Sequence, residues 1–151
     1  SLAHKSTIYI LAILKCEEVR VKDVREETRR LWAQALEDLK TSKVLIDGSR
    51  YYAACFFAHQ AAEKALKAVY IEEKRDFPPK THNLLELGRF LGLKELEEDL
   101  MELNPEYTIS RYPDAANGIP AELYTEKMAE RQVGRAGKVI EICKRILFSK
   151  R

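Results

Sequence analysis

Residues 51–68 read YYAACFFAHQAAEKALKA, and this stretch decides the fold. Its first half is apolar on every side, which is typical of a helix at the centre of a bundle or of one half of a dimer contact. Its second half is amphipathic, with Ala62 and Leu66 on one side and Lys64 on the other. The stretch therefore predicts a long, largely buried helix over residues 50–74.

Two further long helices are predicted from apolar residues that recur at steps of three and four. The first covers residues 24–46 and carries Trp32, Leu36 and Leu39. Gly48 is expected to end it and Ser49 to cap the next helix. The last helix covers residues 121–148, with its apolar stripe at Ala129, Val133, Ala136, Ile140, Cys143 and Leu147.

All five prolines fall in two places, Pro78–Pro79 and the segment 105–120, which are therefore predicted to be loops. Between them, Thr81 is expected to cap a short helix that stops near Gly92, and a second short helix is expected over residues 94–103. The segment 105–120 shows no periodicity. An irregular segment of this length in a small domain is usually functional or forms an interface.

These elements predict an all-α fold, an up-and-down antiparallel helical bundle of three long helices plus one or two short ones. We assign residues 24–151 to this bundle domain and residues 1–23 to an N-terminal extension. The apolar run at residues 7–14 fits either a strand or a helix by its pattern. A helix is preferred because no second strand is predicted.

The composition limits the classes of function. The 151 residues suit a single domain. Lys+Arg 26 against Asp+Glu 24 gives a net charge of +2 with both signs mixed, so no basic tail is available to bind nucleic acid by charge alone. No apolar run approaches the ~18 residues of a membrane helix, and no membrane association is expected.

The cysteines and the charged residues indicate the cellular setting. Cys16, Cys55 and Cys143 are odd in number and far apart, which favours reduced thiols in a cytoplasmic protein over disulfides or a structural zinc site. The many Glu, Lys and Arg residues, with few Asn and Gln, are typical of proteins from thermophiles.

Four separated stretches of the chain resemble the HEPN domain family. They are Trp32 to Leu39, the 51–68 run with its QAAEKALK core, PKTHNL at 79–84 and SRYPD at 110–114. They follow the family's order, and the resemblance as a whole covers about residues 29–147. The resemblance implies a helical bundle, commonly a homodimer, that is often encoded beside a minimal nucleotidyltransferase, and a nucleotide-binding role.

The resemblance also implies a possible nuclease. A large branch of the family consists of metal-independent ribonucleases, whose signature is an arginine, four to six intervening residues and a histidine at the start of the last long helix. Arg111 matches the arginine, but Ala116, Asn117 and Gly118 stand where the histidine belongs. Arg75 and His82 match the spacing literally, on the wrong element.

The RYPD box is the strongest candidate site. Pro113 favours extended geometry at Tyr112, so Arg111 and Asp114 would be presented from a loop. Arginine suits bidentate contact with phosphate or carboxylate, and Asp114 could orient it. In the alternative, structural interpretation, Arg111 pairs with a carboxylate and ties the loop to the bundle. The candidate partners are Asp114, Asp38 and Glu63.

Gln60, Glu63, Lys64 and Lys67 lie on one side of the central helix. They would form the polar wall of a groove that meets a nucleotide or an RNA backbone. The alternative is an ordinary i,i+4 salt bridge from Glu63 to Lys67. The alternative is the favoured interpretation for these residues.

The remaining polar and aromatic candidates favour structural roles. His59, Glu63 and His82 suggest a metal site, but a hydrogen-bonded core position for His59 and a surface or capping role for His82 are preferred. The aromatic residues of the central helix are expected in the core or in a dimer contact: Tyr51, Tyr52, Phe56 and Phe57. No metal or other cofactor is expected.

The sequence leaves three hypotheses about function. The leading one is a non-catalytic HEPN protein that binds a partner, most naturally a minimal nucleotidyltransferase, or a nucleotide-like ligand. The alternative is a metal-independent ribonuclease toxin of a toxin–antitoxin pair, which uses Arg111 with Asp114 or His82 as a displaced acid or base. The third is a purely structural dimer module.

Overall fold

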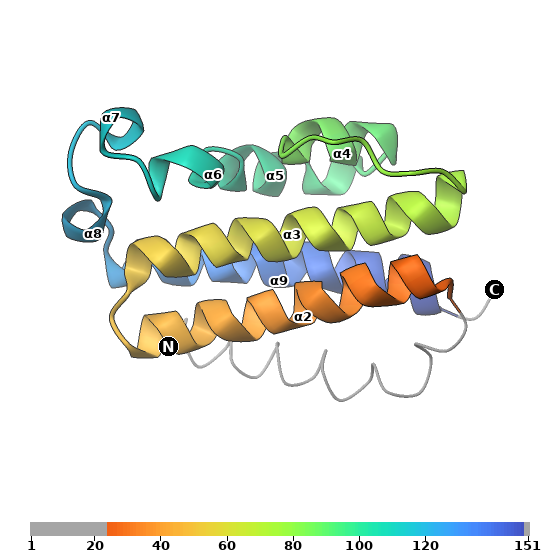
Figure 1. Cartoon of the computed structure of the whole chain (residues 1–151), viewed down its shortest axis with the longest axis horizontal. Helices are drawn as coiled ribbons and strands as arrows, with labels where there is room; N and C mark the ends of the chain where they lie inside the picture. The colour runs from red at the N-terminus through yellow and green to blue at the C-terminus, as the bar shows by residue number, and fades with distance from the viewer. Residues whose placement is uncertain (1–23, 150–151) are drawn as a thin grey trace.

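The computed structural model describes residues 24–149, and this part of the chain is helical without a strand (Figure 1). The helix predicted within residues 1–23 lies outside the described residues. In chain order the helices are α2 (Glu26–Asp47), α3 (Tyr51–Lys74), α4 (Leu84–Phe90), η2 (Lys94–Leu96), α5 (Glu97–Leu103), α6 (Glu106–Ile109), α7 (Pro113–Ala116), α8 (Pro120–Leu123) and α9 (Glu126–Phe148). The predicted all-α class is confirmed.

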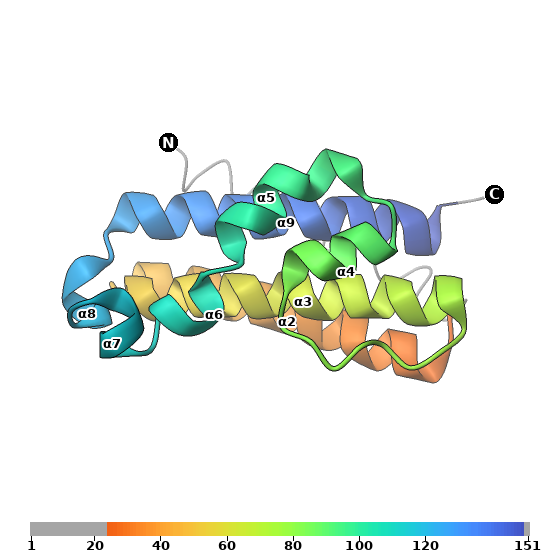
Figure 2. The same ribbon diagram turned by 90° about the horizontal axis from the view of Figure 1, so that it is seen from above.

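The three long helices form the bundle, and α3 packs against both α2 and α9. The short turn between α2 and α3 makes these two helices antiparallel, as expected (Figure 1). Helices α3 and α9 run in the same direction, because the short helices α4 to α8 carry the chain back (Figure 2). Helices α4, α5 and α6 cover the face of α3 and α9 that lies opposite α2 (Figure 1). Among the described helices, none has the length and apolar character needed to cross a membrane.

The centre of the core is built from small residues on α3 and large ones on its neighbours. The α3 residues that are completely buried include Ala54, Ala58, Ala61, Ala62, Ala65 and Ala68. Alanine allows the neighbouring helices to approach closely, and Trp32 of α2 and Ile140 of α9 fill the space without exposure to solvent. The Trp32 ring also packs edge-on against Phe148, with 5.5 Å between ring centroids. The α3 pattern therefore placed this helix correctly at the centre.

Two predicted helix caps are wrong. Gly48 ends α2 as expected, but Ser49 adopts a left-handed conformation (φ 59°) and α3 follows Arg50 with no side-chain cap. Thr81 does not cap α4 either; the Asn83 side chain accepts the backbone N–H of Glu86 at 3.1 Å and takes that position. Ser49 is therefore out of capping geometry, and Thr81 lies two residues before the N-cap position of α4.

The last long helix begins later than its periodicity indicates. Residues 120–123 form the separate turn α8, and Tyr124 is extended. The Thr125 side chain then accepts the backbone N–H of Met128 at 3.2 Å and starts α9 at Glu126. A side-chain cap is favourable by about 1 kcal/mol, which is enough to choose this start over a continuous helix.

The segment 105–120, predicted to be irregular, contains the one-turn helices α6 and α7. Helix α6 contacts α3, and Figure 2 shows it over the N-terminal half of that helix. Asn117 ends α7 in a left-handed conformation (φ 55°). This segment positions the RYPD box against α3.

Candidate ligand-binding site

Arg111 lies in a cluster of four rings that come from separate parts of the chain. We call this the ring cluster; it consists of Phe56, His82, Tyr107, Arg111 and Tyr112. Phe56 comes from α3, His82 from the loop before α4, and Tyr107 from α6. Because α6 packs over α3, residues that are distant in sequence meet here.

The guanidinium of Arg111 is oriented by the backbone one turn earlier. Its Nε donates to the carbonyl oxygen of Tyr107 at 2.7 Å, and its Nη2 donates to the same oxygen. The Cζ atom lies 4.4 Å from the ring centroid of Phe56, 4.6 Å from that of Tyr107 and 5.0 Å from that of Tyr112. Contacts of this kind favour a cation over a ring face. Within residues 24–149, Nη1 of Arg111 has no hydrogen-bond partner.

The ion pair expected for Arg111 is not formed. Within residues 24–149, no ion pair includes Arg111, although Asp38 and Glu63 are both paired with other cations. Asp114 is exposed, and its carboxylate has no hydrogen bond or ion pair in that range. The Tyr107 carbonyl, and not Asp114, orients the guanidinium. The positive charge of Arg111 is therefore balanced only by a carbonyl dipole and ring faces.

His82 is held in the same cluster by a buried carboxylate. Its Nδ1 lies 2.8 Å from Oε1 of Glu63, whose side chain is only 8% exposed. The His82 ring stacks on Tyr107 with 4.0 Å between centroids and 14° between planes. The side chain of His82 is 51% exposed, so its other nitrogen is accessible to solvent. The expected surface position of His82 is confirmed, but its ring is also held by the Glu63 carboxylate and by stacking on Tyr107.

His59 is a hydrogen-bonded core residue, as predicted. It is fully buried, and burial lowers its pKa to about 4, so the ring is neutral at neutral pH. Its Nε2 donates to the carbonyl of His82 at 3.0 Å, and its Nδ1 accepts from Gln60 at 3.3 Å. No group of three or more His, Cys, Asp or Glu side chains within residues 24–149 is placed to hold a metal ion.

The polar residues of α3 point mostly to structural partners. Lys64 Nζ lies 2.6 Å from Oδ2 of Asp38 on α2 and 3.2 Å from Oε1 of Gln60. Lys67 pairs with Glu63 at 3.3 Å, which is the ordinary i,i+4 bridge. Both lysine charges are thus already balanced. The structure brings Arg111, Tyr112 and, through His82, Glu63 together. It pairs Lys64 with α2, and Gln60 hydrogen-bonds to Lys64 and His59 on its own helix.

Two members of the ring cluster were not recognised from the sequence. Tyr107 lies in the segment without periodicity, and Phe56 was assigned to the core or a dimer contact. The spacing of Tyr107 and Arg111, four residues apart, was the available signal, because one helical turn brings such residues together. The contact of Tyr107 with His82 joins residues 25 positions apart and has no local signal.

The two described cysteines are excluded as nucleophiles. Cys55 and Cys143 are buried, and burial raises the pKa of both thiols far above neutral pH. A glutamate beside Cys55 raises its pKa further. Cys16 lies outside the described residues. The ring cluster is therefore the best-developed candidate site in the described part of the chain.

Comparison with known proteins supports the family that the sequence motifs resemble. The HEPN domain model matches residues 28–146. The crystal structure of TT1696 from Thermus thermophilus is similar, with 30% identity, a TM-score of 0.75, and coverage of 82% of this chain and 100% of that chain. The crystal structure of ST0689, an archaeal HEPN homologue, has 29% identity and a TM-score of 0.64, over 83% of this chain and 95% of that chain. The search of curated proteins gives no match. The chain belongs to the HEPN domain family.

Proposed function

We propose that this chain is a non-catalytic HEPN protein that binds a nucleotide-like ligand at the ring cluster. The observation that carries the proposal is the charge of Arg111, which has no carboxylate partner among residues 24–149 and lies among aromatic rings of which Tyr112 is exposed. An arginine with no carboxylate partner and free Nη1 hydrogens is suited to a phosphate oxygen. No described side chain competes with a phosphate for that charge.

The rings provide the second half of the recognition. Tyr112 is 50% exposed, and its ring lies 5.0 Å from the guanidinium carbon of Arg111. A base that stacks on an exposed aromatic ring contributes about 1–3 kcal/mol without requiring a particular base. A phosphate on Arg111 and a base on Tyr112 would therefore be bound together by neighbouring residues.

The proposal is tested by titrating the full chain with AMP and measuring heat or fluorescence. We expect Arg111→Ala to weaken AMP binding at least tenfold, because the phosphate contact is lost. Arg131→Ala is the matched control, since Arg131 is an exposed arginine with no partner among residues 24–149. The affinity of this variant for AMP should stay within twofold of the wild-type value. Equal affinity of the Arg111→Ala variant and the wild type would contradict the proposal.

A second candidate function, a metal-independent ribonuclease, is favoured by one observation. His82 and Arg111 contact the same Tyr107 ring, and a buried carboxylate holds His82 Nδ1. A histidine oriented in this way could act as a general acid or base through its other nitrogen, and arginine can stabilise a phosphate in the transition state. The residues would act as a displaced version of the family's arginine–histidine pair.

Cleavage of end-labelled RNA in the presence of EDTA separates the two candidates. Wild type is compared with His82→Ala, Arg111→Ala and the control Arg131→Ala, all purified identically. The binding proposal predicts no RNA cleavage that depends on His82 or Arg111. If the wild type and the Arg131→Ala control cleave RNA and both cluster variants do not, the binding proposal is contradicted and the ribonuclease function is supported.

A further inference from the structure

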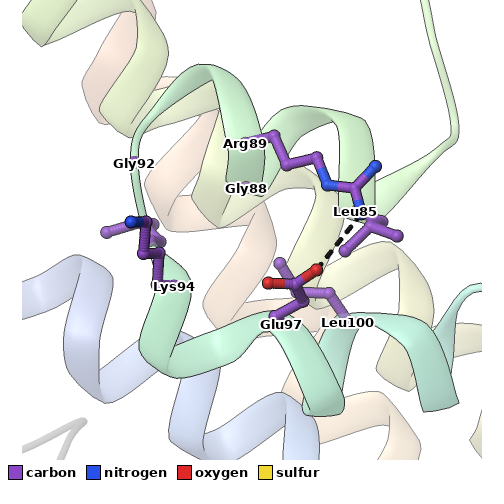
Figure 3. A pocket seen from close by; sticks show the side chains of 8 residues that line it. Leu85, Gly88, Arg89, Gly92, Lys94, Glu97 and Leu100 are labelled. Carbon is purple, nitrogen blue, oxygen red and sulfur yellow. Dashed lines mark hydrogen bonds and ion pairs between the residues drawn. The ribbon is translucent and has the colours of Figure 1, made fainter.

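A cavity of about 200 Å³ lies between α4 and the η2–α5 segment (Figure 3). It shares no residue with the ring cluster. It is lined by Leu85, Gly88, Arg89, Gly92, Leu93, Lys94, Glu97 and Leu100. Leucine side chains and glycine backbone thus form most of its wall, and charged side chains stand at its rim.

Each of the two glycines in the wall has a local structural reason. A Cβ atom at Gly88 would lie 2.4 Å from Cδ1 of Leu100, so a larger residue at this position would require the Leu100 side chain to move. Gly92 has φ +68°, which glycine tolerates best, and it turns the chain from α4 into η2. The two glycines thus keep the wall between α4 and η2 free of side chains at these positions.

The size of the cavity suits one compact apolar group. An apolar cavity of about 150 Å³ is large enough for a benzene ring. In Figure 3, Leu85 of α4 and Leu100 of α5 border the same space. A phenyl ring or a branched aliphatic group between them would exchange water for leucine contacts, which is favourable in proportion to the apolar area covered.

The rim carries one net positive charge. Arg89 Nη2 lies 3.1 Å from Oε1 of Glu97 across the rim, as Figure 3 shows. Their side chains are 67% and 45% exposed, and exposed pairs of this kind contribute about 1 kcal/mol or less. Arg89 can therefore exchange Glu97 for another carboxylate at little cost. Lys94 has no ion pair within residues 24–149.

We propose that this cavity binds a small amphipathic carboxylate. The apolar body of this ligand lies between Leu85 and Leu100, its carboxylate pairs with Arg89, and Lys94 adds a second positive charge on the other side of the rim. A monoanion matches the single net charge of the rim. A free aromatic or branched acid and the C-terminal residue of a peptide both offer this chemistry.

The test is an NMR titration of the full ¹⁵N-labelled chain with phenylacetate, phenylacetamide and benzylamine. We expect amide shifts centred on residues 85–100 and at least fivefold tighter binding of phenylacetate than of the neutral amide or the amine. Binding of the amide or the amine as tightly as the acid would overturn the proposal. So would phenylacetate shifts that leave residues 85–100 unchanged.

Variants locate the site and identify the source of the ligand. Lys94→Glu should weaken phenylacetate binding at least fivefold, whereas Lys127→Glu, the same charge change at another exposed and unpaired lysine, should leave it within twofold. Leu85→Phe, which fills the cavity, should also remove binding while the helical circular dichroism is retained. Equal binding by all variants would overturn the proposal. N-acetylphenylalanine binding tighter than phenylacetate would support the site and identify a peptide terminus; the reverse order would support it and identify a free acid.

Discussion

Two polar regions on the same helix, α3, differ in how their charges are balanced. Between α3 and α2, Lys64 pairs with Asp38, which also accepts a hydrogen bond from Gln34 at 2.9 Å, so both charges of this pair are balanced. In the ring cluster, Arg111 has rings and a carbonyl but no carboxylate. The comparison indicates that the first region joins two helices of the bundle, whereas the second leaves the charge of Arg111 without a carboxylate among the described residues, as the proposed ligand site requires.

The largest expected effect of a single substitution is in the paired region. Asp38→Ala leaves the ammonium of Lys64, which is 24% exposed, without its buried partner. Breaking a buried pair from one side costs about 3 kcal/mol. We expect urea denaturation to show a loss of about that size in the free energy of unfolding.

The neighbouring Glu37→Ala is the control for this prediction. Glu37 pairs with Lys40 at 3.1 Å, but the two side chains are 62% and 46% exposed. The loss of an exposed pair costs about 0.5 kcal/mol. If Asp38→Ala were no more harmful than Glu37→Ala, Lys64 would not depend on its partner, and the contrast between the two regions would disappear.

A second large effect is expected from pH, through His59. Burial lowers the pKa of His59 to about 4, below its ordinary value near 6.5, so the unfolded chain binds a proton more readily than the folded one. The stability that this residue contributes is complete above pH 6.5 and is lost as the pH falls through about 4. The shift corresponds to about 3 kcal/mol at most.

The contribution of His59 is separated from that of nearby carboxylates by comparing variants. His59→Gln keeps a donor that can reach the His82 carbonyl but does not titrate. Urea denaturation at pH 7 and pH 5 should give a smaller loss of stability in this variant than in the wild type. An identical loss in both proteins would mean that other groups cause the acid sensitivity.

A smaller effect on stability is expected in the ring cluster. Arg111→Ala removes contacts with three rings and a backbone carbonyl, and exposed cation–ring contacts contribute about 0.5–1 kcal/mol. We expect the free energy of unfolding to fall by about 1 kcal/mol, less than for Asp38→Ala. A loss larger than that of Asp38→Ala would favour the interpretation in which the RYPD loop only ties helices together.

The bundle was predictable because its signal is local. Trp32, Leu36 and Leu39 recur at the helical period, and a period reports directly which face is buried. The helix ends were less predictable. Ser49 and Asn83 are both common capping residues, but Ser49 is left-handed and does not cap, whereas Asn83 is extended and caps α4. The sequence shows which residue types can cap a helix, but whether one of them does so depends on its backbone conformation.

The candidate site was predictable only in part. Arg111 and Tyr112 were found from a motif, but the partners that orient the guanidinium were not. Tyr107 gains its role from contacts with His82 and Phe56, which are 25 and 51 positions away in the chain. Such contacts follow from the packing of α6 on α3, and a short helix without periodicity gives no indication of its neighbours.

The smallest expected effect is that of Tyr107→Phe. This substitution removes only one oxygen atom, the hydroxyl, from the ring cluster. The hydroxyl of Tyr107 has no hydrogen bond among the described residues, whereas its ring contacts both His82 and Arg111 and its backbone carbonyl holds the guanidinium. Phenylalanine keeps the ring and the carbonyl, so stability should change by less than about 0.5 kcal/mol, which is typical of a substitution that breaks no buried contact. AMP affinity should likewise stay within twofold, because the surfaces offered to phosphate and base are unchanged. A tenfold loss of affinity in Tyr107→Phe with normal stability would place the hydroxyl itself in contact with the nucleotide.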